Sequence, residues 1–321
     1  AGQRKKRTRL AELNVQLTEY RFAELLYTLR YELRKAHLES HFALKKLQVY
    51  QETSTTLRRL LQVYEQQFRK GNIPLTELAR LRALLLDFET ERNTLLHELA
   101  EHQQTLRVLM SLPTETFYLP VLQNELPDMD RVQGWTTTAL LELALNHRVD
   151  YRIVETELKQ AVSLVTYEKS LATPDLNAGF VFDRYGSFAD NYAGLRLSMD
   201  LPVFNRNQGN IQVAEALEQK HKLRLEYIQE EIGQQIATAL QKLRTDATLA
   251  ANYKQESVAE FDRLLVAIVR EYEKRNISMV EFTEYYETFR DYMFQRIQHN
   301  AQLMRHLEDI NFYTGTIIYG Y

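Results

Sequence analysis

The chain has 321 residues and carries 40 Lys and Arg against 43 Asp and Glu, which leaves a formal net charge of −3. This near balance excludes a strongly basic nucleic-acid-binding surface as the main theme. Cysteine is absent, which excludes disulfides, thiolate metal sites and cysteine nucleophiles. Only ten Gly and six Pro are present, and this scarcity of helix breakers predicts long helices rather than an all-β protein.

The first third of the chain predicts two long helices joined by a sharp turn. No Gly or Pro occurs between Arg7 and Phe68, and apolar residues recur at helical spacing on two sides. A helix of this length would measure roughly 90 Å, far more than a compact domain needs. The segment Lys70–Pro74 interrupts it, and a second helix with a leucine seam follows. We therefore predict a long helical hairpin over residues 1–112.

The next two segments are predicted to be a linker and a single helix. Residues 113–135 contain three of the six prolines and are typical of an extended linker. Thr136 and the two threonines after it offer an N-cap, and Pro174 offers a stop. We expect one helix over residues 136–173.

Residues 174–204 change to a period of two, which predicts strands. In the stretch Tyr192–Leu201, alternate residues are apolar, and Ala178–Tyr185 is a plausible partner strand across a turn at 186–191. The apolar face would hold Ala193, Leu195, Leu197, Met199 and Leu201, and the polar face would include Arg196, Ser198 and Asp200. One apolar and one polar face is typical of a transmembrane β-barrel segment. An ordinary amphipathic hairpin covering a helical core fits the period equally well.

A second helical hairpin is expected over residues 205–309. Its first helix runs from Ile211 to about Tyr272, its break falls at Lys274–Ser278, and its second helix reaches Asp309. The remaining residues 310–321 form an aromatic, Gly-containing tail.

The two helix breaks match each other in one ungapped register. Lys70 corresponds to Lys274, and the same spacing aligns Asn72 with Asn276. The register extends to further identities at Arg59 and Arg263, Leu60 and Leu264, Leu61 and Leu265, Ile73 and Ile277, Glu77 and Glu281, Asp87 and Asp291, Arg92 and Arg296, and His102 and His306. A period this long indicates a duplicated half-protein rather than a short repeat.

Four stretches, in this order and with the duplication, resemble the outer-membrane efflux protein family (TolC-like), particularly its heavy-metal (CzcC/CusC-like) branch. Leu201–Ile211 is similar to the family's strand-to-helix junction, and Ala1–Arg7 resembles the same junction in the first half. Asn146–Tyr151 resembles a family Asn-Arg-Pro-Asp-Leu stretch, with Val149 in place of proline, and Tyr272–Glu284 resembles the periplasmic tip. The resemblance covers essentially the whole chain.

The resemblance implies a mainly α fold of very long antiparallel helical hairpins, an α-barrel with internal duplication, plus one β-hairpin of a transmembrane β-barrel. Full family members carry two more helices and a first β-hairpin before the position of residue 1, so we expect that part of the fold to be missing. Three full-length copies would close one shared barrel in the outer membrane, with a helical tube extending into the periplasm. The implied function is a passive conduit of a tripartite efflux system that exports metal cations or small toxic compounds. Its partners would be a periplasmic adaptor protein, an inner-membrane pump and outer-membrane lipid.

A conduit needs a selective mouth, and the resemblance places it just past the second break. Glu281 and Glu284 match an acidic pair of the family's tip constriction, and a ring of carboxylates would favour cations. Tyr272 matches a tyrosine of the closing network. The family's basic partner falls at Ile277, so Arg275 is the substitute that we consider. The alternative is that both glutamates only form a solvated first-turn face, which the helix dipole favours.

The turns at the two breaks would meet the adaptor, as the family implies. The residues concerned are Gly71, Asn72, Ile73 and Pro74 in the first turn and Asn276, Ile277 and Ser278, after Arg275, in the second. The alternative is that they only make the turn, since Gly71 and Pro74 do that regardless. In the membrane, the apolar strand face would meet lipid and the polar face the lumen.

Other chemistry is weakly supported by the sequence. His37 and His41 lie one helical turn apart but without an evident third metal ligand, and Glu218 with His221 is a single Glu-x-x-His. No phosphate-binding or dinucleotide-binding glycine motif occurs. We therefore expect no enzyme, cofactor or nucleic acid partner. A helical-bundle scaffold with an incidental hairpin is the alternative from a different class.

Overall fold

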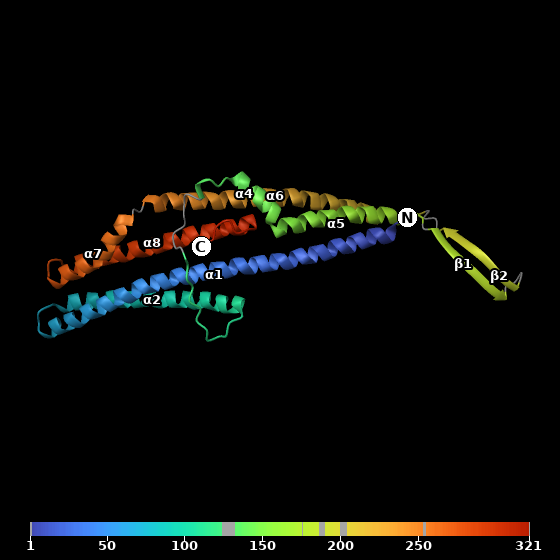
Figure 1. Ribbon diagram of the computed structural model, residues 1–321. Helices are drawn as coiled ribbons and strands as arrows, with labels where there is room; N and C mark the ends of the chain where they lie inside the picture. Colours follow the sequence, from blue (N-terminus) through green and yellow to red (C-terminus); the bar gives the residue numbers. More distant parts are fainter. Residues whose placement is uncertain are drawn as a thin grey trace. The chain divides into compact units, whose positions relative to one another are not determined.

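The computed structural model describes residues 2–123, 132–174, 176–185, 190–199, 204–252 and 255–320 (Figure 1). Long helices and one antiparallel strand pair make up the fold. In chain order the elements are α1 (Gln3–Arg69), α2 (Leu75–Met110), α4 (Thr137–His147), α5 (Val149–Leu171), β1 (Leu176–Tyr185), β2 (Asp190–Met199), α6 (Gln208–Asn252), α7 (Gln255–Glu273) and α8 (Met279–Thr314). Within these described ranges, no helix is sufficiently long and apolar to cross a membrane.

The helix α1 has 67 residues and is unbroken, as the absence of Gly and Pro predicts. At 1.5 Å per residue it measures about 100 Å. The chain divides into two compact units, the first made of Ala1–Leu26 and Leu145–Gln234 and the second of Tyr27–Ala144 and Gln235–Tyr321.

The first unit packs the start of α1 against α5 and the first half of α6. Leu13 and Leu17 of α1 and Ala214 of α6 are almost fully buried. The ammonium group of Lys6 donates to the Thr166 carbonyl oxygen across 3.2 Å, which ties α1 to α5. Glu157 of α5 lies among basic groups of both neighbours, with Arg21, His221 and Arg224 at 3.6 to 3.8 Å.

One expectation for this region is wrong. The single helix expected over 136–173 is two helices, because Arg148 between α4 and α5 has extended backbone angles. Its guanidinium donates to the Asp150 carboxylate at 2.6 and 3.0 Å, and Asp150 also accepts from the Tyr151 backbone N–H. An acidic residue in the first turn suits a new helix start, so this local pairing accounts for the restart.

The strand pair has the predicted two faces. Antiparallel register places Phe180 opposite Leu195 and Ala178 opposite Leu197, so these apolar residues share one face. The other face pairs Asn177 with Ser198. Of the turn predicted at 186–191, residues 186–189 lie outside the described residues, and Asp190 and Asn191 belong to β2.

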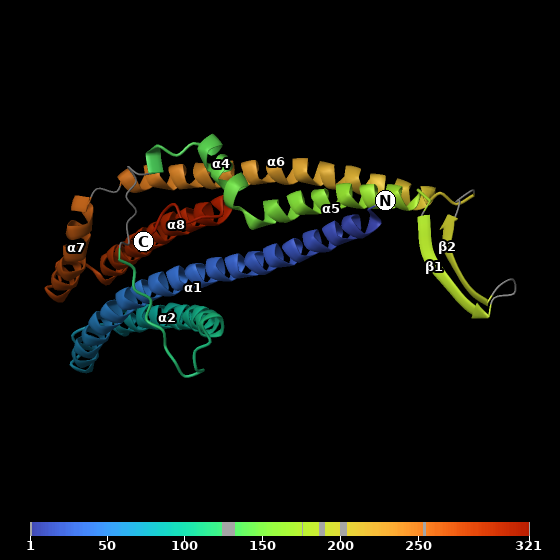
Figure 2. The same cartoon turned by 45° about the vertical axis from the view of Figure 1, so that its right-hand side comes forward.

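The second unit is built around the two helical hairpins. Helices α1 and α2 lie side by side in both views (Figures 1 and 2), and the Arg58 guanidinium donates to Glu89 across 2.6 Å between them. The core is a stripe of buried side chains from α1, α2, α7 and α8, centred on Leu57, Leu60, Leu81, Phe88, Phe282 and Tyr286. The regularly spaced leucines of α1 and α2 therefore pack within one hairpin and also against the other hairpin.

Candidate functional site

The two hairpin turns fold as matching corners. Gly71 and Arg275 both adopt left-handed backbone, with φ of 75° and 61°. The following residue in each, Asn72 or Asn276, donates its backbone N–H to the carbonyl five positions earlier at 2.9 Å. This is the closing pattern that helices use at left-handed C-terminal caps. The duplication inferred from the sequence is thus visible as repeated backbone geometry.

The predicted docking residues of these turns divide into outward and inward groups. Asn72 and Asn276 are exposed, but each side-chain amide donates back to the side chain five positions earlier, Gln67 and Glu271 respectively. Ile73 is buried and Ile277 is half-buried against the core stripe. Gly71, Pro74 and Arg275 are exposed, and so is Ser278, whose hydroxyl accepts from the Glu281 backbone N–H.

A continuous row of aromatic rings joins the two hairpins behind the turns. Tyr272 stacks on Tyr64 of α1 at 5.0 Å between ring centroids and on Phe282 of α8 at 4.4 Å. The row continues through Tyr286, Phe88, Tyr50 and Phe294. Burial, then the Tyr64 hydroxyl, raises the pKa of Tyr272, so it stays neutral. Tyr272, which the family resemblance matched to a tyrosine of the closing network, is thus buried within this row.

The two glutamates of the predicted mouth are both exposed on the first turns of α8. Glu281 is the third residue of a capping box: it accepts from the Ser278 backbone N–H at 2.7 Å, while its own N–H donates to the Ser278 hydroxyl. The backbone hydrogen bond and then the hydroxyl lower the pKa of Glu281, so it is ionised. The carboxylate that was expected to line the mouth therefore also holds the helix start.

Glu284 has a different environment from Glu281. It lines a groove between α2 and α8 of about 420 Å³, together with Arg80, Asp87 and Glu287. Within the described residues, no ion pair joins Arg275 to either predicted mouth glutamate, so the structure does not bring the suggested basic partner to them.

The strand residues predicted to face lipid are uncovered. Leu195 is 90% exposed and Leu197 is 71% exposed, and Met199 is exposed as well. On the polar face Arg196 is exposed and Ser198 is half-buried. The predicted face residues Leu201 and Asp200 lie outside the described residues. An amphipathic hairpin covering a helical core would bury its apolar face, and this one does not.

His37 and His41 of α1 contact the linker that follows α2. His41 Nδ1 lies 3.1 Å from the Pro120 carbonyl oxygen, and His37 Nδ1 lies 3.3 Å from the Tyr118 hydroxyl. Gln103 of α2 both donates to and accepts from the Tyr118 backbone, at 2.8 and 2.9 Å. These contacts give the histidines a structural use that the sequence pattern did not specify.

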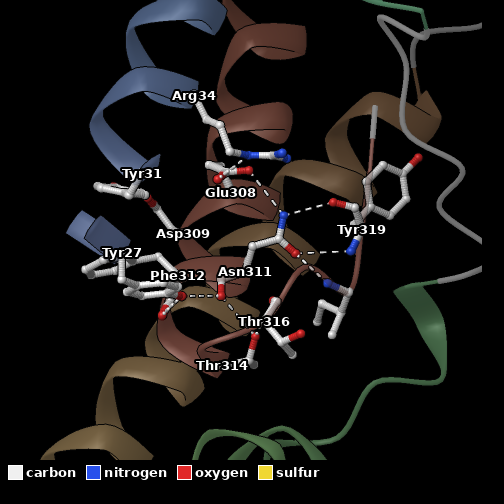
Figure 3. Close-up of polar contacts among 11 residues, drawn as sticks. Tyr27, Tyr31, Arg34, Glu308, Asp309, Asn311, Phe312, Thr314, Thr316 and Tyr319 are labelled. Carbon is white, nitrogen blue, oxygen red and sulfur yellow. Dashed lines mark hydrogen bonds and ion pairs between the residues drawn. The ribbon is translucent and has the colours of Figure 1, made fainter. Parts of the chain in front are cut away.

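The C-terminal tail is fixed by one buried asparagine that sequence reasoning missed (Figure 3). Asn311 of α8 accepts from the Ile318 and Tyr319 backbone N–H groups at 2.9 and 3.1 Å, and it donates to the Tyr319 carbonyl and to Glu308. Glu308 in turn accepts from Arg34 of α1 at 2.6 Å. A polar residue between Ile310 and Phe312, four positions before Gly315, was the only available signal.

No family model matches the chain, and no curated protein matches it significantly. Several solved structures do match over nearly its whole length. The channel CusC is 17% identical, with 98% of this chain and 74% of that chain covered and a TM-score of 0.76. The outer-membrane channel CmeC of Campylobacter jejuni is 15% identical, with 99% and 70% covered and a TM-score of 0.79. The outer-membrane protein VceC of Vibrio cholerae is 13% identical, with 98% and 76% covered and a TM-score of 0.79.

This chain has the TolC-like channel fold. The fold expected from the resemblance is confirmed, including long helical hairpins and an antiparallel strand pair.

Proposed function

We propose that the protein is a channel subunit of a tripartite efflux system, located in the outer membrane with a periplasmic extension. The observation that carries this proposal is the uncovered apolar face of β1 and β2, on a chain whose fold is that of outer-membrane channels. Leu195, at 90% exposed, has no helix over it, and lipid is the environment that such a face suits. Three copies would pair their strands into one closed sheet. The chain would act as a passive conduit and not as an enzyme.

The proposed mouth is formed by Glu281 and Glu284, repeated around the assembly. Glu281 is ionised because the helix cap lowers its pKa, and Glu284 is exposed beside two further carboxylates of its groove. A ring of such charges favours cations over anions. The exported cargo would then be metal cations or small toxic compounds. An adaptor protein would meet the corners, and an inner-membrane pump would supply the cargo.

Charge-neutral variants test the mouth. The double variant E281Q/E284Q should lower the preference for K⁺ over Cl⁻, measured as the reversal potential across a planar bilayer under a KCl gradient. This variant removes the two charges but keeps the helix cap, because Gln at the third helical position also serves in a capping box. The matched control is S278A, which breaks the same cap but leaves both charges in place.

Two outcomes separate the parts of the proposal. A reversal potential that is unchanged in E281Q/E284Q, or shifted as much in S278A, would exclude the glutamates as the selective ring. Absence of any conductance from the full chain, in bilayers that accept a known outer-membrane channel, would overturn the conduit itself and favour the scaffold alternative.

A further inference from the structure

A cavity lies in the second unit where the end of α8 and the start of the tail face α1 (Figure 3). Its volume is about 520 Å³, which is within the range of small-molecule sites. None of the residues assigned to the mouth, the corners or the strands lines it. The cavity is therefore a separate feature, and binding of a ligand there does not depend on the proposed channel function.

The wall of this cavity is mainly aromatic. Phe312 stacks against Tyr27 at 5.2 Å and is tilted against Tyr31 at 4.3 Å between ring centroids. Ile317 lies at the rim and is 63% exposed. Rings held in place by one another keep their positions without a ligand. Such a wall suits a flat apolar ligand, because aromatic surfaces pack in offset or edge-to-face contact.

One cationic side chain of the cavity lining, Arg30, has no anionic partner in the described part of the chain. The lining holds Arg30, Arg34 and a single carboxylate, that of Glu308. Glu308 is nearly fully buried and already accepts from Arg34 at 2.6 Å. Arg30 is exposed, and the described part of the chain offers it no hydrogen-bond or ion-pair partner. The lining residues therefore carry a net positive charge from a guanidinium, which matches carboxylate geometry. Beside the lining, the Asp309 carboxylate accepts from the Tyr31 hydroxyl, and the Lys35 ammonium lies 5.8 Å from the centroid of the Tyr31 ring.

The helix end beside the cavity does not cancel this charge. Free carbonyl groups at a helix C-terminus would repel an anion. Here the Tyr27 hydroxyl donates to the Asn311 and Phe312 carbonyl oxygens at 2.9 and 2.7 Å, and Gly315 also donates to Phe312. The Asn311 and Phe312 carbonyl oxygens are thus occupied by donors from the protein itself.

We propose that this cavity binds a small aromatic anion, with its ring in the wall formed by Tyr27, Tyr31 and Phe312 and its acidic group at Arg30. The probe that fits this description is 2-naphthoate, and 2-naphthylmethanol is its neutral analogue. The comparison of the two separates the charge at Arg30 from the aromatic wall.

The experiment is calorimetric titration of 2-naphthoate into the full chain in detergent, with the micelle heat subtracted. We expect one site per chain. The variant R30Q should weaken binding about tenfold, the scale of a hydrogen-bonded charge contact, and should leave 2-naphthylmethanol unaffected. The matched control R59Q removes an exposed arginine of the same helix that does not line the cavity, and it should bind like the wild type.

A second variant keeps the test independent of Arg30. Ile317 is exposed at the rim, so I317D places a carboxylate there without disturbing the core and should also weaken 2-naphthoate. Equal affinity of R30Q and the wild type would overturn the proposal. Absence of saturable 2-naphthoate binding would overturn it too. This includes the case in which 2-naphthoate cannot bind because a second copy of the chain fills the cavity.

Discussion

At the scale of single residues, Asp309 shows how a partly buried carboxylate is kept ionised. Burial raises its pKa, but the His306 ring and the Tyr31 hydroxyl oppose that effect and leave the pKa below the ordinary 3.8. The Tyr31 hydroxyl donates to it at 2.7 Å, and His306 Nδ1 lies 3.6 Å away. His306 also lies 3.1 Å from Asp246, so this group links α1, α6 and α8.

The lowered pKa of Asp309 makes stability depend on pH. Since the folded state favours the ionised form, the stabilisation is complete above pH 3.8 and is lost as the pH falls through the lowered pKa. We expect D309N to lose about 1–3 kcal/mol of unfolding free energy at pH 7, the range for a hydrogen bond to a charged group. The difference from the wild type should shrink as urea unfolding is repeated at lower pH.

The control for this residue is Y31F, which removes one donor to Asp309 and keeps the ring stacked on Phe312. It should show a smaller loss with the same direction of pH dependence. A D309N deficit that stays constant from pH 7 to below the lowered pKa of Asp309 would contradict the assignment, because an uncharged packing defect does not titrate.

At the scale of elements, the two corners differ at one strained position. Arg275 holds a left-handed conformation that Gly71 holds in the equivalent corner, and a side chain there costs about 1–2 kcal/mol. We expect R275G to raise the unfolding free energy by about 1 kcal/mol and G71A to lower it by a similar amount. No atom lies within 4 Å of a Cβ built on Gly71, so the loss would come from the backbone alone.

The neighbouring Lys274 provides the comparison for this pair. It lies in the same turn but is not among the residues with positive φ, so K274G should bring no gain. Urea unfolding measures all three variants. If R275G and K274G behaved alike, the left-handed strain would not be the cause.

The sequence predicted an element correctly where the residues that determine it lie within that element. The unbroken α1 followed from the absence of Gly and Pro, and the corners followed from the repeated Asn-Ile pair. The break at Arg148 was missed, because it depends on the Arg148–Asp150 pairing rather than on a breaker residue. The clamp at Asn311 was missed as well, since its partners Ile318 and Tyr319 become visible only once the tail folds back. The apolar face with Leu195 and Leu197 was predicted from the two-residue period alone. That period did not decide whether the face is covered, and the structure shows that both residues are exposed.

At the scale of the whole molecule, substitutions in the strand pair β1 and β2 test whether the protein inserts into a membrane. An arginine on the lipid face of such a strand costs about 2–4 kcal/mol near the bilayer midplane, whereas a lumen-facing substitution is tolerated. We therefore expect L195R to reduce the fraction of protein recovered in outer-membrane fractions of a Gram-negative host, relative to the wild type.

The same substitution on the opposite face of the same strand is the matched control. Ser198 pairs with Asn177 on the polar face, so S198R should reach the membrane normally. Equal recovery of L195R and S198R would count against membrane insertion of this hairpin, because a strand pair exposed to water on both sides does not distinguish them.

The capped Asn side chains at the corners restrict how another protein can recognise them. Because Asn72 and Asn276 are engaged with their own helices, a protein that distinguishes the two corners would do so at the positions at which the duplicated halves have diverged. At the equivalent positions one corner has the uncharged Gly71 and the other has the cationic Arg275. Lys70 and Lys274 are exposed in both corners, so a binding protein with two identical modules would meet one cation at the first corner and a second cation, Arg275, beside Lys274 at the other. Contacts with the second corner would therefore depend more strongly on salt.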